Sequence, residues 1–234
     1  MVSGLPMRKL VLFDIDGTLI TDHGAARHAF GAALSDIYGY DGDLARYDFS
    51  GRTDPQIAFM ILRDAGLSDE DITARLPDLW SRYLRYLATN ATPERVQSLP
   101  GIRTLLERLE KESRITLALL TGNIEPGARI KLGGASLNEY FPFGAFGSDS
   151  ANREELPPIA VERASQIDGY RFGGRDVVII GDSIYDVRCG TPHDATTIAV
   201  ASGKTPAEKL IAENPHHFFE SAEDLESMMR AIMG

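Results

Sequence analysis

A chain of 234 residues with 43% apolar and 25% charged residues has the composition of a globular protein, and its length suits one large domain or a domain with an insertion. Its formal net charge of −10 argues against a nucleic acid as the main partner, because binding a phosphate backbone needs clustered Lys and Arg. No apolar run approaches a membrane span, so we expect no membrane partner. The single cysteine, Cys189, excludes an intrachain disulfide and a zinc cluster of cysteines, and favours a cytoplasmic protein with a packed thiol.

The first predicted strand, Lys9–Phe13, leads into the acidic sequence Asp-Ile-Asp-Gly-Thr at residues 14–18. The run is short and apolar without helical spacing, which is typical of a strand buried in a parallel sheet. Ligands bind outside the carboxyl ends of such strands, and alternation lets Asp14 and Asp16 share one side. One carboxylate is able to attack phosphorus while its neighbour handles the proton. An ordinary acidic turn is the alternative at this point.

Residues 21–98 contain no convincing strand and several helix signals. We predict one helix over Ala25–Tyr38, a second that begins after Thr53 and stops at Gly66, and a third capped by Ser68. This block separates the first strand from all the others. We therefore expect an all-helical cap at residues 21–98, inserted into a core made of residues 1–20 and 99–234.

Short apolar runs alternate with amphipathic segments in the rest of the chain, which predicts βαβ units and a doubly wound, mostly parallel α/β sheet. The predicted strands are 115–120, 145–146, 177–180, 197–200 and 217–219. Helices are predicted after Pro100, over Leu156–Ile167, and after Ser221, with Asp224 completing a capping box.

Polar residues follow two more of these strands. Thr121 and Gly122 come after the second, where the hydroxyl is able to hold a phosphate oxygen or only to shape a turn. Asp182 and Asp186 come after the fourth, and acids there often only complement a helix dipole. Two acidic clusters at two strand ends nevertheless crowd like charges together, and all-oxygen ligands suit magnesium.

The joint pattern resembles the haloacid dehalogenase superfamily of phosphohydrolases. The sequence Asp14-x-Asp16-Gly-Thr resembles its first motif, Thr121 its second, and Gly-Asp182-x-x-x-Asp186 its fourth. Their order and spacing span nearly the whole chain. The helical insertion after the first motif is similar to the cap of the subgroup that includes phosphoglycolate phosphatases and β-phosphoglucomutases.

The resemblance implies a role for each acid. Asp14 would attack phosphorus and form an aspartyl-phosphate. Asp16 would protonate the leaving oxygen and then activate water. Asp14, the backbone carbonyl of Asp16, and Asp182 would hold Mg²⁺, with Asp186 supporting them.

The resemblance also implies groups that bind the phosphoryl oxygens, namely Thr121 with Gly122 and a third-motif lysine. The corresponding stretch, residues 148–158, has no lysine, and Arg153 is its only cation. We expect Arg153 to replace the lysine, because a guanidinium suits phosphate, with Lys131 as the second candidate and a surface ion pair as the alternative. In similar proteins the cap loop around Arg52 faces the substrate, so Arg52 is a candidate for substrate contact.

We therefore predict a magnesium-dependent phosphatase, a phosphoric monoester hydrolase, acting on a small phosphorylated metabolite. A β-phosphoglucomutase-type phosphomutase would keep every core motif, and a non-catalytic phosphate-sensing module would need neither an acid like Asp16 nor a large cap. A dehalogenase would not need Asp16 or magnesium. A phosphonatase would want a cap lysine, and residues 21–99 contain none. Neither the substrate nor an oligomeric state follows from the sequence.

Overall fold

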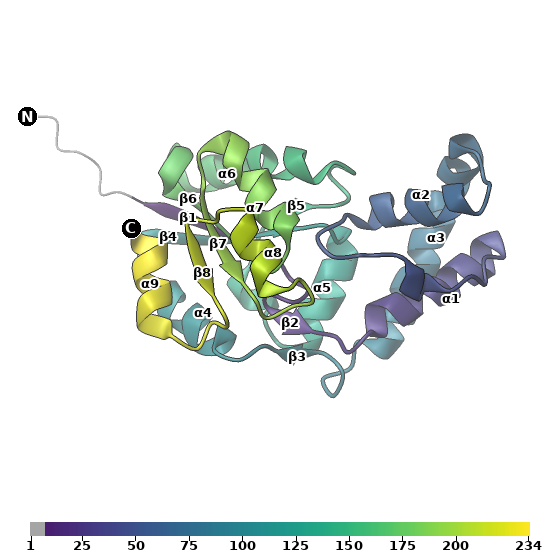
Figure 1. Ribbon diagram of the computed structural model, residues 1–234, viewed down its shortest axis with the longest axis horizontal. Coiled ribbons are helices and arrows are strands. Elements are labelled where there is room, and N and C mark those ends of the chain that lie inside the picture. Colours follow the sequence, from purple (N-terminus) through teal and green to yellow (C-terminus); the bar gives the residue numbers. More distant parts are fainter. Residues whose placement is uncertain (1–7) are drawn as a thin grey trace, which may run out of the picture.

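The computed structural model describes residues 8–234, in which a six-stranded sheet carries helices on both faces (Figure 1). Neighbouring strands are all parallel, in the order β5-β4-β1-β6-β7-β8, which confirms the predicted doubly wound α/β core. The strands of this sheet are β1 (Lys9–Phe13), β4 (Ile115–Thr121), β5 (Gly144–Phe146), β6 (Val177–Gly181), β7 (Thr196–Val200) and β8 (His217–Phe219).

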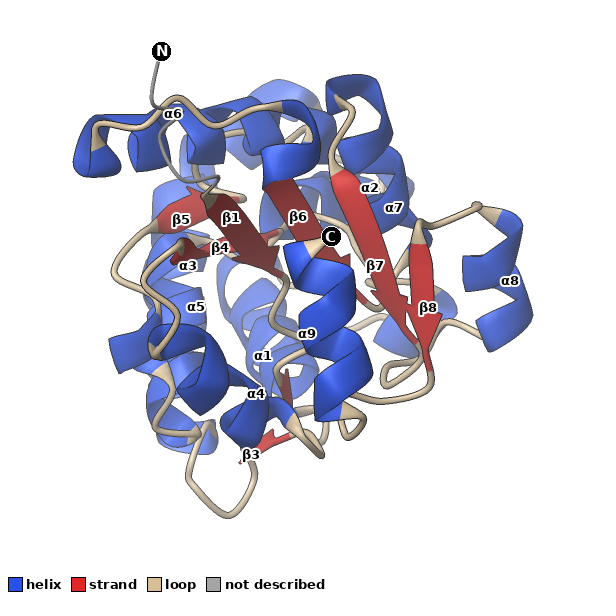
Figure 2. Ribbon diagram, turned by 90° about the vertical axis from the view of Figure 1, so that its left-hand side faces the viewer, coloured by secondary structure: helices blue, strands red, loops and turns tan. Residues whose placement is uncertain are grey.

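Alternate residues of β1 pack into two separate layers of the core. Val11 and Phe13 belong to the cluster that includes residues of α4, α5 and α9, whereas Leu10 and Leu12 pack with α6. Figure 2 shows these helices around the strands. The core helices are α4 (Ile102–Glu110), α5 (Glu125–Gly134), α6 (Leu156–Asp168), α7 (Ile184–Gly190), α8 (Ala207–Ala212) and α9 (Leu225–Met233). The strand is therefore buried on both faces, as its continuous apolar run predicts.

Three helices lie between β1 and α4 in the chain and form the helical unit at one end of the molecule (Figure 1). They are α1 (Ala25–Tyr38), α2 (Asp54–Asp64) and α3 (Asp69–Asn90). The N-caps are the predicted residues Thr53 and Ser68, whose hydroxyls accept from backbone N–H groups of the first turn. Phe30 of α1 packs against Tyr83 of α3 with ring centroids 5.3 Å apart. The predicted cap helices are confirmed, while the boundaries of the cap domain stay a prediction.

Two details of the fold differ from the prediction. Strands β2 (Ile20–Thr21) and β3 (Gln97–Ser98) form an antiparallel pair where the chain leaves and re-enters the core. Two residues are too few to show a period-2 pattern, which is why the sequence did not reveal them. The last helix begins later than expected, because Asp224 is itself the N-cap of α9. Short 3₁₀ turns complete the fold at Leu44–Arg46, Asn138–Tyr140, Arg153–Glu155, Gly174–Asp176 and Thr191–His193.

The structure bears on two expectations drawn from the composition, a packed cysteine and the lack of a membrane-spanning helix. The thiol of Cys189 is buried and free, and burial raises its pKa to about 12, which confirms a packed rather than a reactive cysteine. Within residues 8–234, no helix has both the length and the apolar character that crossing a membrane requires.

Candidate active site

Asp14 and Asp182 lie side by side because they follow neighbouring parallel strands. The backbone N–H of Asp14 donates to the carbonyl of Ile180, 3.0 Å away, which continues the pairing of β1 with β6. Asp186 joins them from the first turn of α7, where a reciprocal capping arrangement with Ser183 holds it. The three acids are each less than a tenth exposed, and each offers an oxygen within 4.8 Å of the others. The two acidic segments of the sequence therefore form one cluster.

Arg153 supplies a positive charge to this cluster from the 3₁₀ turn before α6. Its Nη2 donates to Oδ1 of Asp14 (3.1 Å) and to Oδ1 of Asp186. Its Nη1 donates to the carbonyl of Gly51 in the cap (3.2 Å). The side chain is only 5% exposed, so the alternative of a surface ion pair with neighbouring glutamates is wrong.

Burial makes the acidic cluster costly in its charged form. Burial raises the pKa of Asp14 to about 7; Arg153 opposes this shift, and Asp186 and Asp16 add to it. Burial, followed by repulsion from Asp14, raises the pKa of Asp182 well above 3.8. When ionised, the three carboxylates of the cluster outweigh the one guanidinium by two negative charges. A divalent cation would balance that excess.

The donor set of the cluster fits magnesium, which prefers carboxylate and water oxygens. The glycines around Asp182 leave its carboxylate room: a Cβ on Gly17 would lie 2.5 Å from Oδ2, and one on Gly203 would lie closer still. Oδ1 of Asp182 accepts from the hydroxyl of Thr18 at 3.3 Å. The carboxylate of Asp16 is not part of the cluster, so only its backbone carbonyl stays a predicted ligand.

Thr121 reaches the same edge of the sheet from β4, the strand on the other side of β1. Its Oγ1 accepts from Nδ2 of Asn123 (2.8 Å) and from the Asn123 backbone N–H (3.3 Å). The carbonyl of Gly122 accepts from the backbone N–H of Asp54 (2.7 Å), at the start of cap helix α2. A Cβ on Gly122 would collide with the carbonyl of Arg52, so only glycine permits this approach of cap and core.

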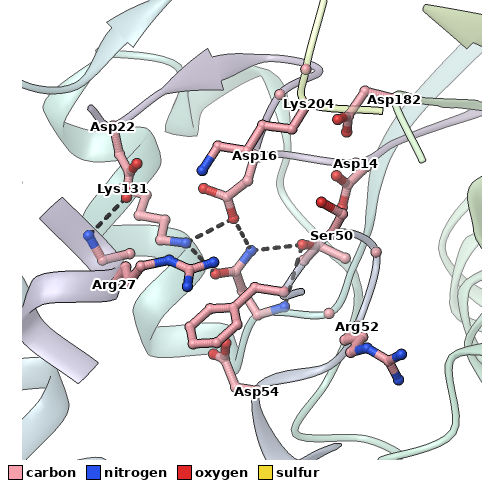
Figure 3. Close-up of a pocket in the computed structure, with 18 of the residues that line it drawn as sticks. Asp14, Asp16, Asp22, Arg27, Ser50, Arg52, Asp54, Lys131, Asp182 and Lys204 are labelled. Atoms are coloured by element: carbon pink, nitrogen blue, oxygen red, sulfur yellow. Dashed lines mark hydrogen bonds and ion pairs between the residues drawn. The ribbon is translucent and has the colours of Figure 1, made fainter. Parts of the chain in front are cut away.

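A cavity of about 420 Å³ lies between these strand ends and the cap (Figure 3). Its charged lining residues are the acids Asp14, Asp16, Asp22, Asp48, Asp54 and Asp182 and the cations Arg27, Arg52, Lys131, Arg153 and Lys204. Apolar walls come from the cap, with Phe30, Ile57 and Tyr83. A cavity of this size suits a small molecule.

A model of the haloacid dehalogenase-like hydrolase family matches residues 11–191, the segment that supplies the acidic cluster, Thr121 and Arg153. The chain belongs to the haloacid dehalogenase-like hydrolases. The resemblance inferred from the motifs is thereby confirmed, as is the expectation of an enzyme of the hydrolase class.

Solved structures share the fold of this haloacid dehalogenase-like hydrolase over nearly its whole length. A hydrolase from Pseudomonas syringae is 21% identical with a TM-score of 0.72, covering 96% of this chain and 99% of its own. A predicted phosphoglycolate phosphatase from Haemophilus somnus is 16% identical with a TM-score of 0.70 (97% and 100% covered). A proposed β-phosphoglucomutase from Thermotoga maritima is 20% identical with a TM-score of 0.62 (96% and 99% covered). No curated protein sequence matches the chain significantly.

In this haloacid dehalogenase-like hydrolase, Asp16 forms an ion pair that the sequence did not indicate. Nζ of Lys131 lies 2.7 Å from Oδ2 of Asp16, and the lysine side chain is 4% exposed. Burial alone would lower the pKa of Lys131, but Asp16, Tyr83 and Asp22 outweigh it, so the pKa is raised and the ammonium stays charged. Lys131 therefore lies in the cavity, although it contacts Asp16 rather than the acidic cluster that Arg153 contacts.

The sequence feature that points to Lys131 as a cavity residue is its charge on the buried face of a helix. Ala128, Lys131 and Leu132 are all buried on the same side of α5. A lysine at this spacing among apolar residues indicates a buried charge that needs an acidic partner, but the local pattern does not say which acid that is.

Arg52 lines the cavity, but its guanidinium turns away from the acids in Figure 3. Its Nε donates to the carbonyl of Asp48 (3.1 Å), and its guanidinium carbon lies 5.5 Å from the ring centre of Tyr185. In this arrangement the Arg52 side chain contacts other residues of the protein. Contact between Arg52 and a substrate stays a prediction.

Asp54 is a cavity residue that sequence reasoning treated only as part of a helix start. It is 9% exposed, and its Oδ2 accepts from the backbone N–H of Ile124 (2.8 Å). Burial raises its pKa to about 6, while Lys131 and the Ile124 N–H oppose the shift. Pro at the next position favours a helix start so strongly that it masked any second role.

Proposed function

We propose that this hydrolase is a magnesium-dependent phosphatase that acts on a small phosphorylated metabolite through an aspartyl-phosphate on Asp14. The observation that carries the proposal is the position of Asp14. Its carboxylate meets Asp182, Asp186 and Arg153 at one end of a cavity that the cap covers, and Asp16 stands two residues away.

In the first step, an Asp14 oxygen forms a bond to phosphorus while the bond from phosphorus to the ester oxygen breaks. The leaving oxygen takes that electron pair and the proton of the Asp16 carboxyl group. Arg153 and Thr121, which line the cavity beside Asp14, would hold the other phosphoryl oxygens. Positioning and charge stabilisation of this kind provide most of the catalysis in phosphoryl transfer.

In the second step, a water oxygen bonds to phosphorus and the bond to Asp14 breaks. Asp16, now ionised, takes a proton from that water, and the products are inorganic phosphate and the regenerated carboxylate of Asp14. Closure of the cap over the bound substrate would keep bulk water away from the first step. This sequence uses Asp16 once as an acid and once as a base.

Asp14 and Asp182, with the backbone carbonyl of Asp16, would hold the magnesium ion, and Asp186 would support Asp182 and Arg153. The bound ion supplies neutralisation of the charge that the phosphoryl group adds to an already acidic cluster.

A phosphomutase remains the second candidate, and it would need a group such as a lysine to hold the sugar phosphate while it is reoriented. Residues 21–99 contain no lysine, yet Lys131 and Lys204 of the core line the same cavity. The ion pair with Asp16 keeps Lys131 protonated, which argues against Schiff-base chemistry but not against a mutase.

The test is product analysis with a purified enzyme and its Asp14→Asn variant. A panel of phosphorylated metabolites is followed for free phosphate and for positional isomers together. We expect phosphate release by the wild-type protein and none by Asp14→Asn, whose amide is a poor nucleophile, with unchanged circular dichroism. Wild-type rates in Asp14→Asn would refute the aspartyl-phosphate. Isomer formation faster than phosphate release would favour the mutase.

A further inference from the structure

Three side chains of the cavity form a closed hydrogen-bonded triangle around one oxygen of Asp16. Oδ2 of Asp16 accepts from Nζ of Lys131 (2.7 Å) and from Nδ2 of Asn123 (2.8 Å). Nζ of Lys131 also donates to Oδ1 of Asn123 (2.6 Å), which closes the triangle (Figure 3). Over residues 8–234, no group bonds to Oδ1 of Asp16, the other oxygen of the same carboxyl group.

The triangle is held from the core and not from the cap. Lys131 rises from α5, with 4% of its side chain exposed. Asn123 is fixed by its bonds to Thr121 at the end of β4. Charge-assisted hydrogen bonds are short and strong, so the two bonds to Oδ2 define the orientation of Asp16 before any substrate arrives, although 42% of its side chain is exposed.

The two oxygens of Asp16 are therefore chemically different. An oxygen that already accepts from an ammonium and an amide has no room for its own proton, because that proton would face two donors. The proton of the neutral carboxyl group must then sit on Oδ1.

We propose that Lys131 is a positioning residue for the proton-transfer steps. By occupying Oδ2 together with Asn123, it makes Oδ1 of Asp16 the oxygen that gives a proton to the leaving group and later takes one from water. This inference rests on the proposed phosphatase function, and it gives Lys131, the second candidate for the third-motif cation, a different role.

The charges around Lys131 argue against the other obvious role, binding an anionic group of the substrate. The ammonium interacts with three acids, Asp16, Asp22 and Asp54, all lining the same cavity. Its single positive charge is therefore more than balanced by the protein. A substrate carboxylate or second phosphate would add a further negative charge to this wall.

The experiment compares two esters that differ in how much their leaving group needs a proton: phenyl phosphate and p-nitrophenyl phosphate. Their kcat/KM values are measured with magnesium present, since kcat/KM includes the departure of the leaving group. We expect Lys131→Met to lower kcat/KM about 100-fold for phenyl phosphate and less than about 10-fold for p-nitrophenyl phosphate, since proton transfer contributes about 10²–10⁴-fold. Lys131→Arg should recover part of the loss for phenyl phosphate.

Lys204→Met is the matched control, because it removes a lysine charge from the same cavity, and within the described residues no bond joins Lys204 to Asp16. Its effect should be equal for the two esters. In an Asp16→Asn background, Lys131→Met should lower kcat/KM by less than a further factor of about three for either ester, because Lys131 acts through Asp16.

Equal losses for both esters in Lys131→Met would overturn the proposal, and so would an ester-dependent loss in Lys204→Met. If Lys131→Met does not fold by circular dichroism, the comparison is made with Lys131→Gln, which keeps a donor. Failure of both variants to fold would make Lys131 a purely structural residue. An inactive wild-type protein, or an active Asp14→Asn variant, would instead refute the phosphatase function itself.

Discussion

Nη1 of Arg153 donates to the carbonyl oxygen of Gly51, 3.2 Å away, while Nη2 of the same guanidinium contacts Asp14. One buried cation therefore joins Asp14, the proposed nucleophile of the core, to the loop that precedes cap helix α2. A fork with donors in two directions is what makes this double contact possible, and a lysine has no such geometry.

We expect Arg153→Ala to lower kcat about 10²–10³-fold, the loss seen when a group that stabilises transition-state charge is removed. Arg153→Lys should recover part of this loss, because it restores the charge beside Asp14 but not the second contact to Gly51. Steady-state kinetics on the best substrate of the panel measures both. Arg188→Ala, which removes the ion pair between Arg188 of α7 and Glu213 at the end of α8, is the control and should be close to wild type. An unaffected Arg153→Ala would show that another cation binds the phosphoryl group.

Magnesium should stabilise the protein as well as activate it. Binding to the folded state at 100 times Kd adds about 2.7 kcal/mol, which corresponds to a rise of about 5–10 °C in Tm for a chain of this size. We expect that rise in a thermal melt of the wild-type protein, its loss with EDTA, and its absence in Asp182→Ala. Asp186→Ala should be affected less. If neither Tm nor the rate of phosphate release changed with magnesium or EDTA, no metal would neutralise the cluster.

Asp54 should make stability fall as pH rises. Its folded-state pKa is about 6 against an ordinary 3.8, so the folded protein holds this proton more tightly than the unfolded chain does. The resulting loss of stability develops between about pH 4 and pH 6 and reaches about 3 kcal/mol above that range. The Asp54→Asn variant should lack this pH-dependent loss. The free energy of unfolding measured in urea should therefore exceed that of the wild type by about 1–1.5 kcal/mol more at pH 8 than at pH 5. A difference in unfolding free energy that does not depend on pH would mean that ionisation of Asp54 does not destabilise the folded protein.

The charge balance of the cavity predicts which substrates are disfavoured. Six acidic and five basic side chains line it, and the phosphoryl group adds negative charge of its own. Glycerol 3-phosphate and 3-phosphoglycerate share a three-carbon skeleton and differ in a hydroxymethyl or a carboxylate group. We expect kcat/KM to be at least about 10-fold higher for glycerol 3-phosphate, because juxtaposed like charges cost several kcal/mol. A preference for 3-phosphoglycerate would show that one of the cations lining the cavity binds the carboxylate.

The parts of the fold and site that the sequence predicted are those governed by local patterns. The six strands of the sheet stand out as short apolar runs, and Asp14 and Asp182 stand out because each follows one. The pairing of Lys131 with Asp16 joins residues 115 positions apart. Such a contact depends on how α5 packs on the sheet, which no local pattern encodes. The short strands β2 and β3 escaped notice for the opposite reason, since two residues carry too little pattern.

The hydrogen bonds between residues 51–54 and the core have a consequence for how amino-acid substitutions change this enzyme. Three of them end on main-chain carbonyl oxygens, those of Gly122, Ala151 and Gly51, so none of these acceptors is a side-chain group. The side chains of Phe30, Ile57 and Tyr83 on the cap wall take no part in that seam. Substitutions on this wall would therefore change the shape of the cavity without removing a hydrogen bond between residues 51–54 and the core, and their cost would fall on packing inside the cap, where Phe30 and Tyr83 are buried.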